Sequence, residues 1–341
     1  MPQLHLGTMT FGWAKNTSSL CDDAVASEMM QAFAGKGGVH FDTARIYADG
    51  ETERIIGRVF DPSGTRNKFR VATKAHPSQP GGLSDKGIRD QLQASLSAMG
   101  EQRVDVLYLH QPDTNCDLTE SLATCDALVK EGLVGSIGLS NYSAVETDRL
   151  VQLCQSNGWV QPAVFQGLYN PLNRRVEEQL LPVLRKHNIA FIAFNPLAAG
   201  LLTGKHTKDG EVPPGRFKDN GNYLPRFYTD PNFQALDLIR EACAAHGVSL
   251  VEATYAWLMH HSVLSGSEDG ILLGASSMAQ LEENMSACQG SKPLHADVVT
   301  AFEKAWAITA PEAFAYWRSY SKDHPDRDAL DQGASYNAKK S

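Results

Sequence analysis

The sequence predicts an α/β fold, a (β/α)8 barrel in which eight parallel strands alternate with helices. Eight short runs of β-branched or apolar residues recur along the 341-residue chain. Most of these runs are apolar almost throughout, which is typical of parallel strands buried on both faces. Amphipathic stretches separate the runs, and strands that alternate with helices indicate parallel βαβ units. Because the chain has no internal repeat and no linker, we expect a single barrel over residues 1–318.

The expected strands are all short and nearly continuous in apolar character. We place them at Leu4–Met9, Val39–Thr43, Phe69–Lys74, Val104–His110, Ser136–Asn141, Ala163–Tyr169, Ala190–Asn195 and Gly270–Gly274. Between them, the apolar residues of Glu120–Lys130 recur at three- and four-residue spacing, as on one face of a helix. Asn173–His187 has the same pattern, but Pro182 falls inside it, so we expect a kink or a break there.

Two segments depart from the alternation of strands and helices. Residues 203–232 are rich in Gly, Pro, Asn and Asp and follow the seventh expected strand. A long loop in a compact domain is usually functional, so we expect this one to serve the site. The end of the chain, residues 319–341, is polar and charged, and we expect it to be a frayed tail.

Composition narrows the class of protein. The chain is 42% hydrophobic and 21% charged with a net charge of −8, which suits a globular domain and gives no sign of a nucleic-acid partner. The six cysteines have no metal-ligand spacing and indicate reduced thiols: Cys21, Cys116, Cys125, Cys154, Cys243 and Cys288. The first residues do not resemble a signal peptide, and no apolar run approaches the length of a membrane span. We therefore expect a cytoplasmic protein.

Polar residues stand at the ends of the expected strands. In a (β/α)8 barrel the active site lies at the C-terminal ends of the strands. Asp42, Lys74 and His110 end three consecutive strands, and adjacent strands lie roughly 4.8 Å apart, so the three side chains can converge. Tyr47 lies on the next loop and can fold back over the mouth. Further strand ends contribute Ser140–Asn141, Gln166, Asn195 and Gly274–Ser277.

These residue types suit the reduction of a carbonyl group by hydride. Such a reaction needs a proton donor for the developing alkoxide and a polar group beside the oxygen. A lysine cation lowers the pKa of a tyrosine phenol, ordinarily about 10, and a carboxylate orients the lysine. Taken singly, an aspartate at a strand end is usually a turn or cap residue, and a lysine there usually lies on a solvated rim. The four together favour Tyr47 as the acid, with Lys74, Asp42 and His110 in support.

With these residues in these places, the chain resembles the aldo-keto reductase superfamily. The similarity lies in motifs that occur in that family's order: FDTARIYADGETERIIG, VATKAHP, VLYLHQPD, IGLSNYS, VFQGLYN and AFNPLAAGLLTGK. LCQSNGWVQPAVFQGLYN, GRF and GASSMAQLEEN resemble its aflatoxin-aldehyde (succinic semialdehyde) reductase branch. The resemblance covers about residues 4–318 and implies a catalytic tetrad of Asp42, Tyr47, Lys74 and His110.

The resemblance also implies an NADP(H) site. Its nicotinamide end would include Ser140, Asn141 and Gln166, with Tyr169 stacked on the ring. The pyrophosphate would lie under Asn195, Pro196, Leu197, Gly200, Leu202, Gly204 and Lys205. The 2′-phosphate would meet the start of the last barrel helix and its surroundings: Gly274, Ser276, Ser277, Gln280, Glu283, Asn284 and Arg216. Helix N-termini favour anions, although a serine-capped helix is common without one. In many other branches of the family a basic residue directly follows the position of Gly274, but none does so here.

The substrate implied is a small carbonyl compound. Trp13, Tyr47, His110, Tyr223, Arg226 and Arg318 match the family's pocket. In family members two such arginines look suited to an acid group on the far end of the substrate. The branch also implies a homodimer, for which the residues themselves give no separate signal.

Three other classes of protein fit less well. A Rossmann enzyme would carry GxGxxG, which is absent from the sequence. A metal-dependent barrel hydrolase would have clustered ligands at strand ends, whereas His260–His261 fall in a helical pattern without HxH, so we expect no metal. A cofactor-binding regulatory barrel, like the subunits that attach to ion channels, is the remaining alternative, and the complete tetrad argues against it.

Overall fold

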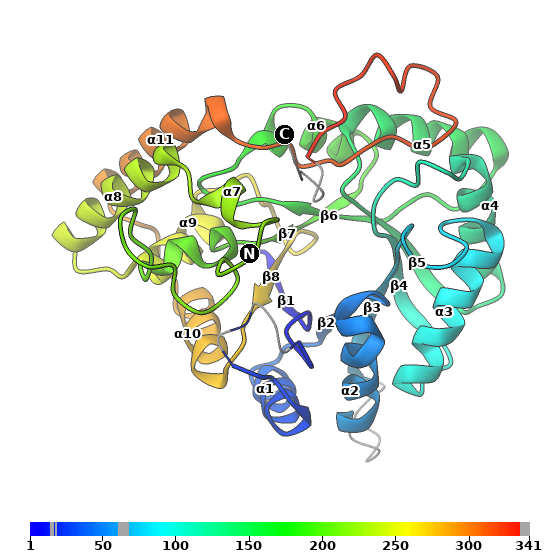
Figure 1. Ribbon diagram of the computed structural model, residues 1–341, viewed down its shortest axis with the longest axis horizontal. Helices are drawn as coiled ribbons and strands as arrows, with labels where there is room; N and C mark the ends of the chain where they lie inside the picture. The colour runs from blue at the N-terminus through cyan, green and yellow to red at the C-terminus, as the bar shows by residue number, and fades with distance from the viewer. Residues whose placement is uncertain (14–16, 18, 61–67, 335–341) are drawn as a thin grey trace.

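The computed structural model describes residues 1–13, 17, 19–60 and 68–334, and these form a closed barrel of eight parallel strands (Figure 1). The strands follow one another around the barrel in chain order, and β8 closes on β1. Their bounds are β1 Gln3–Gly7, β2 His40–Asp42, β3 Arg70–Ala75, β4 Val104–Leu109, β5 Val134–Ser140, β6 Val164–Leu168, β7 Ala190–Phe194 and β8 Gly270–Gly274. The predicted (β/α)8 barrel is therefore confirmed, with a strand in each of the eight predicted places.

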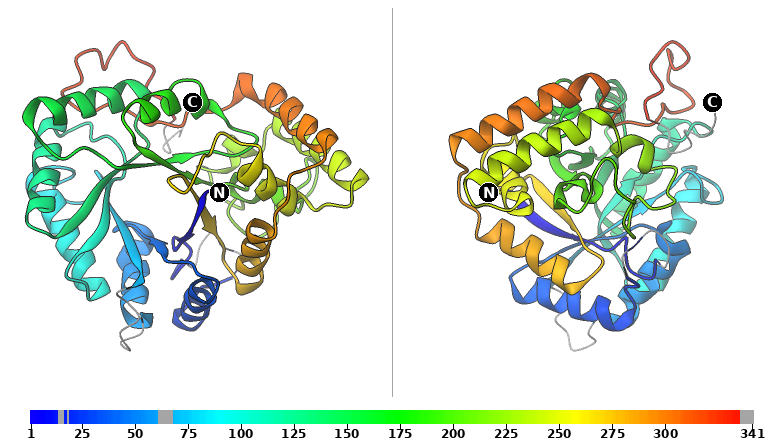
Figure 2. Two further views of the ribbon diagram at one scale, coloured as in Figure 1. Left: turned by 180° about the vertical axis from the view of Figure 1, so that it is seen from behind. Right: turned by 60° about the vertical axis from the view of Figure 1, so that its left-hand side comes forward.

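Helices surround the strands on all sides, as the two further views in Figure 2 show. The α-helices are α1 Asp23–Gly35, α2 Glu51–Val59, α3 Asp85–Met99, α4 Leu118–Lys130, α5 Ala144–Asn157, α6 Leu180–Lys186, α7 Leu224–Phe227, α8 Asp230–Ala245, α9 Leu250–His260, α10 Met278–Gln289 and α11 Ala296–Thr309. Short 3-10 turns occur at η1 Tyr47–Gly50, η3 Arg175–Glu177, η4 Ala198–Thr203 and η5 Ala310–Glu312. No helix among the described residues is both long and apolar enough to cross a membrane.

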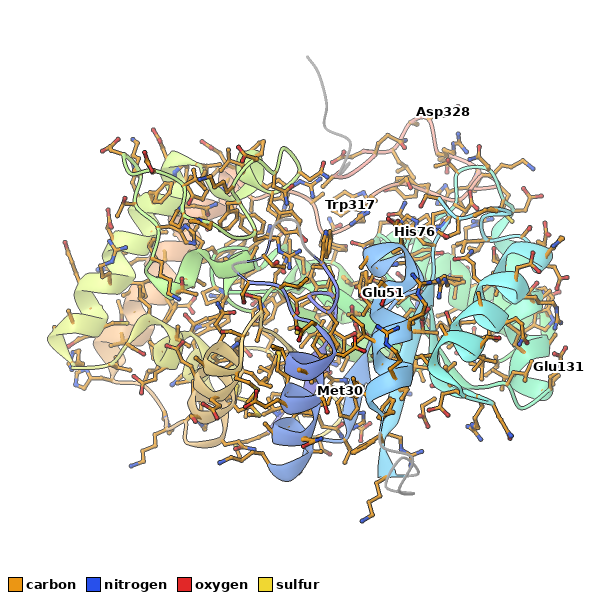
Figure 3. All side chains as sticks on the ribbon, turned by 60° about the horizontal axis from the view of Figure 1, so that its bottom comes forward. Met30, Glu51, His76, Glu131, Trp317 and Asp328 are labelled. Atoms are coloured by element: carbon orange, nitrogen blue, oxygen red, sulfur yellow. The ribbon has the colours of Figure 1, made fainter. Side chains whose placement is uncertain are left out.

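Sequence signals for helix ends explain much of this ring. Ser84 and Ser143 cap the starts of α3 and α5, where each hydroxyl accepts a hydrogen bond from the backbone N–H three residues on. The same two helices end at Gly100 and Gly158, both with positive φ, the conformation in which a helix most readily stops. Apolar side chains between the strands and the helices are buried in one continuous core, while charged ones such as Glu131 and Asp328 project outward (Figure 3).

The predicted helix at 173–187 is broken, but not at Pro182. The chain forms η3 and then α6, with the interruption at Glu178–Gln179. Pro182 lies in the first turn of α6, where a backbone N–H would have no partner within the helix, so proline is tolerated there.

The end of the chain differs from its expectation as a frayed tail. Residues 319–334 run beside α5 (red in Figure 1), and Tyr320, Ser321 and His324 are buried. Asp323 accepts a hydrogen bond from Leu118 N at the start of α4 and pairs with Arg149 of α5 at 2.6 Å. The polar composition of this segment predicted exposure to solvent, but its polar groups hydrogen-bond to residues of the barrel helices. Residues 335–341 lie outside the described part of the chain.

Candidate active site at the strand ends

Asp42 and Lys74 form a buried ion pair at the centre of the barrel mouth. Lys74 Nζ donates to Asp42 Oδ1 at 2.5 Å and to the Thr43 carbonyl at 2.8 Å, and the lysine is 1% exposed. Gln166 Nε2 donates to the second oxygen of Asp42 at 2.7 Å. Charges removed from water are tolerated when they are paired and hydrogen-bonded, as here. The pair fixes the ammonium group of Lys74 in one place.

The surroundings act on the lysine in opposite directions. Burial is the larger effect and lowers the pKa of Lys74, while Asp42 and, more weakly, Glu53 raise it. Glu53 is fully buried in the first turn of α2, where it accepts from Thr73 Oγ1 at 2.6 Å and pairs with Arg45 at 2.5 Å. A second carboxylate therefore supports the cation behind the Asp42 pair.

Tyr47 begins the turn η1 directly above Lys74. The Lys74 Nζ lies 5.2 Å from the centroid of the Tyr47 ring. The backbone of this turn is sharply bent, with positive φ at Ala48 and Asp49. Gly50, at φ 85°, lets the Arg45 guanidinium approach, because a Cβ there would lie 1.6 Å from Arg45 Nη2. The Arg45–Glu53 pair thus closes the loop that carries Tyr47.

His110 follows β4 and completes the group. Its ring meets the Tyr47 ring edge-on at a centroid distance of 5.9 Å. Burial, followed by the nearby charge of Lys74, holds the pKa of His110 well below its usual range, so the imidazole is neutral. Asn141 Nδ2 donates to the His110 carbonyl at 2.9 Å, whereas His110 Nδ1 is buried without a hydrogen-bond partner in the described structure.

Backbone strain is concentrated at this end of the barrel. Among the described residues, eight non-glycine residues have positive φ. Six of them lie on the segments that leave the C-terminal ends of strands: Ala48, Asp49, Asn141, Asn195, Ala198 and Ala199. Such conformations cost about 1–3 kcal/mol each and cluster at functional sites. The concentration of strain therefore supports a functional site at the C-terminal ends of the strands.

The residues expected at the nicotinamide end lie together beside the ion pair, with one exception. Ser140 ends β5 and Asn141 follows it, their side chains are joined by a 3.0 Å hydrogen bond, and Gln166 on β6 contacts Asp42. Tyr169 does not face the mouth. Its ring is fully buried against Phe191 and Trp257, and its hydroxyl donates to Glu177 at 2.7 Å. The predicted stacking of Tyr169 on the nicotinamide is therefore not possible in this conformation, because the ring is fully buried against Phe191 and Trp257.

The segments expected at the phosphates border open space. At Gly274, the end of β8, an added Cβ would meet no atom within 4 Å, and at Gly200 only His206 Nε2 at 4.0 Å. Ser277 caps α10 by accepting from Gln280 N, Ser276 N donates to Gln280 Oε1, and Asn284 Nδ2 donates to the Gly274 carbonyl. Pro196, Leu197 and Leu202 are buried, Gly204 has positive φ, and Lys205 and Glu283 are exposed. The glycine positions and the helix start fit an extended, phosphate-bearing cofactor.

Arg216 lies between two aromatic rings at the rim. Its guanidinium carbon is 5.4 Å from the Trp13 ring centroid and 5.3 Å from that of Tyr223. The contact joins the loop after β1 to the 203–232 loop, two segments distant in sequence. Arg216, Trp13 and Tyr223 thus form a bridge across the rim, at the side of the 203–232 loop.

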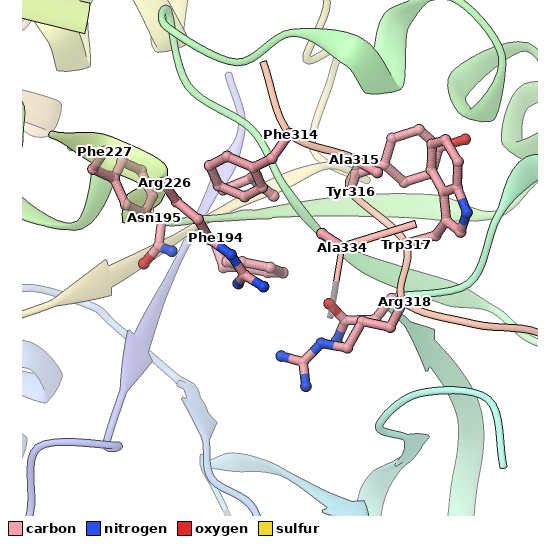
Figure 4. Close-up of a pocket in the computed structure, with 12 residues that line it drawn as sticks. Phe194, Asn195, Arg226, Phe227, Phe314, Ala315, Tyr316, Trp317, Arg318 and Ala334 are labelled. Atoms are coloured by element: carbon pink, nitrogen blue, oxygen red, sulfur yellow. The ribbon is translucent and has the colours of Figure 1, made fainter. Parts of the chain in front are cut away.

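A hollow beside the tetrad is lined by both arginines expected to bind substrate. The guanidinium groups of Arg226 and Arg318 extend into it from opposite sides (Figure 4). Its wall also includes Asn141, Leu168, Phe194, Asn195, Phe227, Phe314, Ala315, Tyr316, Trp317 and Ala334. Tyr47, His110, Trp13 and Tyr223 do not line it, although Asn141 connects it to His110.

Two groups of residues that line this hollow were not predicted from the sequence. Phe194 is the last residue of β7 and presents the aromatic ring at the mouth that Tyr169 does not. Its place at the end of an apolar strand, directly before Asn195, was the available signal. Phe314 and Trp317 follow α11, and no periodic pattern in the sequence marks their segment as part of the mouth.

Comparison with known proteins agrees with this geometry. The Aldo/keto reductase family model matches residues 3–307. Aflatoxin B1 aldehyde reductase member 2 of Homo sapiens is 40% identical over 325 residues, covering 92% of this chain and 89% of the human protein. The protein of the same name from Mus musculus is 39% identical over 329 residues, covering 93% and 88%. Aldo-keto reductase family 7 member A3 of Homo sapiens is 38% identical over 329 residues, covering 93% and 97%.

The chain therefore belongs to the aldo/keto reductase family, and the resemblance drawn from its motifs is confirmed. Members of this family generally use NAD(P)H. Membership supports an oxidoreductase that acts on the carbonyl group of aldehydes or ketones.

Proposed function

We propose that this protein is an NADPH-dependent reductase that converts aldehydes or ketones to alcohols, with Asp42, Tyr47, Lys74 and His110 as its catalytic residues. The observation that carries the proposal is the buried Lys74–Asp42 pair beneath the Tyr47 ring, with the neutral His110 ring beside it. A proton donor, a cation that favours its deprotonation and a carbonyl-orienting group meet within a few ångströms. That is the set that carbonyl reduction requires.

In the proposed mechanism the substrate oxygen lies between the Tyr47 hydroxyl and the His110 ring. NADPH, when bound, supplies the hydride. Tyr47 donates its proton to the oxygen as negative charge develops there, and the Lys74 ammonium stabilises the resulting phenolate. Asp42 holds that ammonium in place. The neutral imidazole of His110 orients the oxygen without competing as an acid.

The proposed cofactor site runs from the tetrad to the start of α10. Ser140, Asn141 and Gln166 would hold the carboxamide of the nicotinamide, and Phe194 would offer its ring in place of Tyr169. The glycine-bearing segment Asn195 to Lys205 would cover the pyrophosphate. Gly274, Ser276, Ser277, Gln280, Glu283 and Asn284 would surround the 2′-phosphate. Arg216 is the cation we assign to that phosphate, and it is the basis for preferring NADPH to NADH.

The proposed substrates are aldehydes with an acid group distant from the carbonyl. Arg226 and Arg318 support this class because both guanidinium groups extend into the hollow that adjoins His110 through Asn141. Trp13 and Tyr223 would form an apolar wall nearer the rim. A guanidinium matches a carboxylate with two parallel hydrogen bonds, which gives direction as well as affinity.

Steady-state assays test the proposal. The protein should oxidise NADPH in the presence of 4-nitrobenzaldehyde, and succinic semialdehyde should give a higher kcat/KM than a neutral aldehyde of similar size. NADPH binding without turnover on either aldehyde would instead indicate a cofactor-binding regulatory barrel. A cytoplasmic location and a homodimer remain predictions, and light scattering of the purified protein tests the latter.

A further inference from the structure

Arg318 is held in the mouth by the residue next to His110. Arg318 Nη1 donates to Gln111 Oε1 at 2.6 Å, and Arg318 N donates to the Asn141 carbonyl at 3.1 Å. Gln111 directly follows His110 in the chain. The group expected to orient the carbonyl and the group that holds the guanidinium are therefore adjacent residues on the segment that directly follows β4.

His76 supports Gln111 from the other side. The Ser78 backbone N–H donates to His76 Nδ1 at 3.0 Å, which leaves the proton of the neutral imidazole on Nε2. The Gln111 side chain interacts with this ring and raises its pKa, and the His110 ring meets it edge-on at a centroid distance of 4.9 Å. Burial lowers the pKa of His76 to about 4, so the imidazole is neutral near pH 7. His76, Gln111 and Arg318 form a chain of contacts, which we call the Arg318 support.

A neutral support has a chemical consequence. A carboxylate beside Arg318 would orient the guanidinium but would also cancel its charge. The amide oxygen of Gln111 orients the guanidinium without adding a negative charge, and the guanidinium lies close enough to lower the pKa of both His76 and His110. An arginine oriented by a neutral partner suits recognition of an anion brought by a ligand.

We propose that Gln111 and His76 are positioning residues that set the specificity of this enzyme for acid-bearing carbonyl substrates, by fixing the Arg318 guanidinium at a set distance from His110. This inference rests on the proposed function, because it requires Arg318 to meet a substrate carboxylate. Gln111 would then determine the preference for acidic over neutral substrates, a role that the tetrad does not fulfil.

The test measures the ratio of kcat/KM for succinic semialdehyde to that for a neutral aldehyde of similar size. Gln111→Glu places a carboxylate on Arg318 and should lower the ratio by about tenfold, mainly through a higher KM for the acidic substrate. Gln111→Met removes the oxygen but adds no charge, so its loss should be smaller. His76→Phe keeps a ring against His110 but removes the polar interaction with Gln111, and it should resemble Gln111→Met. Gln155→Glu, an exposed change of the same charge on α5, is the control and should leave the ratio unchanged.

A double-mutant cycle separates this inference from the function on which it rests. If Gln111 acts through Arg318, Gln111→Met, which adds no charge of its own, should have no further effect on the ratio in an Arg318→Met background. If Arg318→Met lowers the ratio but Gln111→Glu does not, the inference is wrong and the acid-binding function stands. If Arg318→Met itself leaves the ratio unchanged, the proposed substrate class fails first. Circular dichroism of each variant verifies folding, and equal losses on both substrates would overturn the positioning role.

Discussion

Lys74 and Asp42 are joined by a 2.5 Å ion pair in which the lysine side chain is wholly buried and the aspartate nearly so. Stability does not explain the pair, because a buried ion pair rarely stabilises a fold more than well-packed apolar residues of similar volume would. Its position suggests a different use. The Lys74 ammonium lies 5.2 Å from the Tyr47 ring centroid, close enough to favour the phenolate over the phenol.

Removing that charge should change both rate and pH dependence. In the proposed mechanism reduction uses the protonated phenol of Tyr47, so the rate should fall as pH rises through the pKa of that phenol. Lys74→Met removes the cation that we propose stabilises the phenolate, so kcat should drop by about a hundredfold or more and the alkaline limb of the pH–rate profile should move to higher pH. Asp42→Asn should give a smaller effect of the same kind. pH–rate profiles measure both, and unchanged profiles in the two variants would rule out the proton-transfer unit while leaving the fold intact.

Arg216 should distinguish the two nicotinamide cofactors. If its guanidinium contacts the 2′-phosphate, Arg216→Met should weaken the binding of NADPH by about tenfold or more. The binding of NADH should weaken much less, since only NADPH carries the additional phosphate. Fluorescence titration gives the two dissociation constants. Equal weakening would mean that Arg216 serves only to bridge Trp13 and Tyr223 across the rim.

Arg226 and Arg318 should matter for acidic substrates only. A charge-assisted hydrogen bond is worth about 1.5–3 kcal/mol, so Arg226→Met and Arg318→Met should each lower kcat/KM for succinic semialdehyde by roughly ten- to a hundredfold. Neutral aldehydes should lose much less. The same loss on both substrate types would favour a bulky or hydrophobic carbonyl compound instead.

Buried histidines should make the fold sensitive to acid. Burial lowers the pKa of His5 to about 3, against about 6.5 in an unfolded chain. Below pH 6.5 the unfolded chain therefore binds more protons, and the free energy of unfolding should fall as pH decreases from 6.5 toward 3. His5→Phe removes this titration and should reduce the loss between pH 7 and pH 5 by about 1–2 kcal/mol. Urea denaturation at the two pH values decides it, and a loss as large in the variant as in the wild type would contradict the account.

The sequence predicted the barrel and the tetrad for the same physical reason. Buried parallel strands are apolar throughout, so a polar residue such as Asp42 or His110 is conspicuous where a strand ends. Lys74 and Gln166 are recognisable in the same way, and the ion pair between neighbouring strands follows from the closed order of the barrel.

What could not be predicted depends on contacts between distant segments. Tyr169 and Phe194 both lie at strand ends, and only packing against Trp257 decides that the first ring is buried outside the mouth while the second faces it. The segment after α11 shows the same limit. Its polar residues indicate a solvated tail, yet hydrogen bonds to Glu146 and Arg149 of α5 hold it against the barrel.

The most direct measurement of the central claim is the turnover of Tyr47→Phe with NADPH and 4-nitrobenzaldehyde. The change removes the hydroxyl and keeps the ring that contacts His110 and Lys74. If Tyr47 is the proton donor, kcat should fall by at least about a hundredfold while the dissociation constant for NADPH stays within a few-fold of the wild-type value. A kcat close to wild type would contradict the assignment of Tyr47 as the acid, and with it the mechanism proposed for this site.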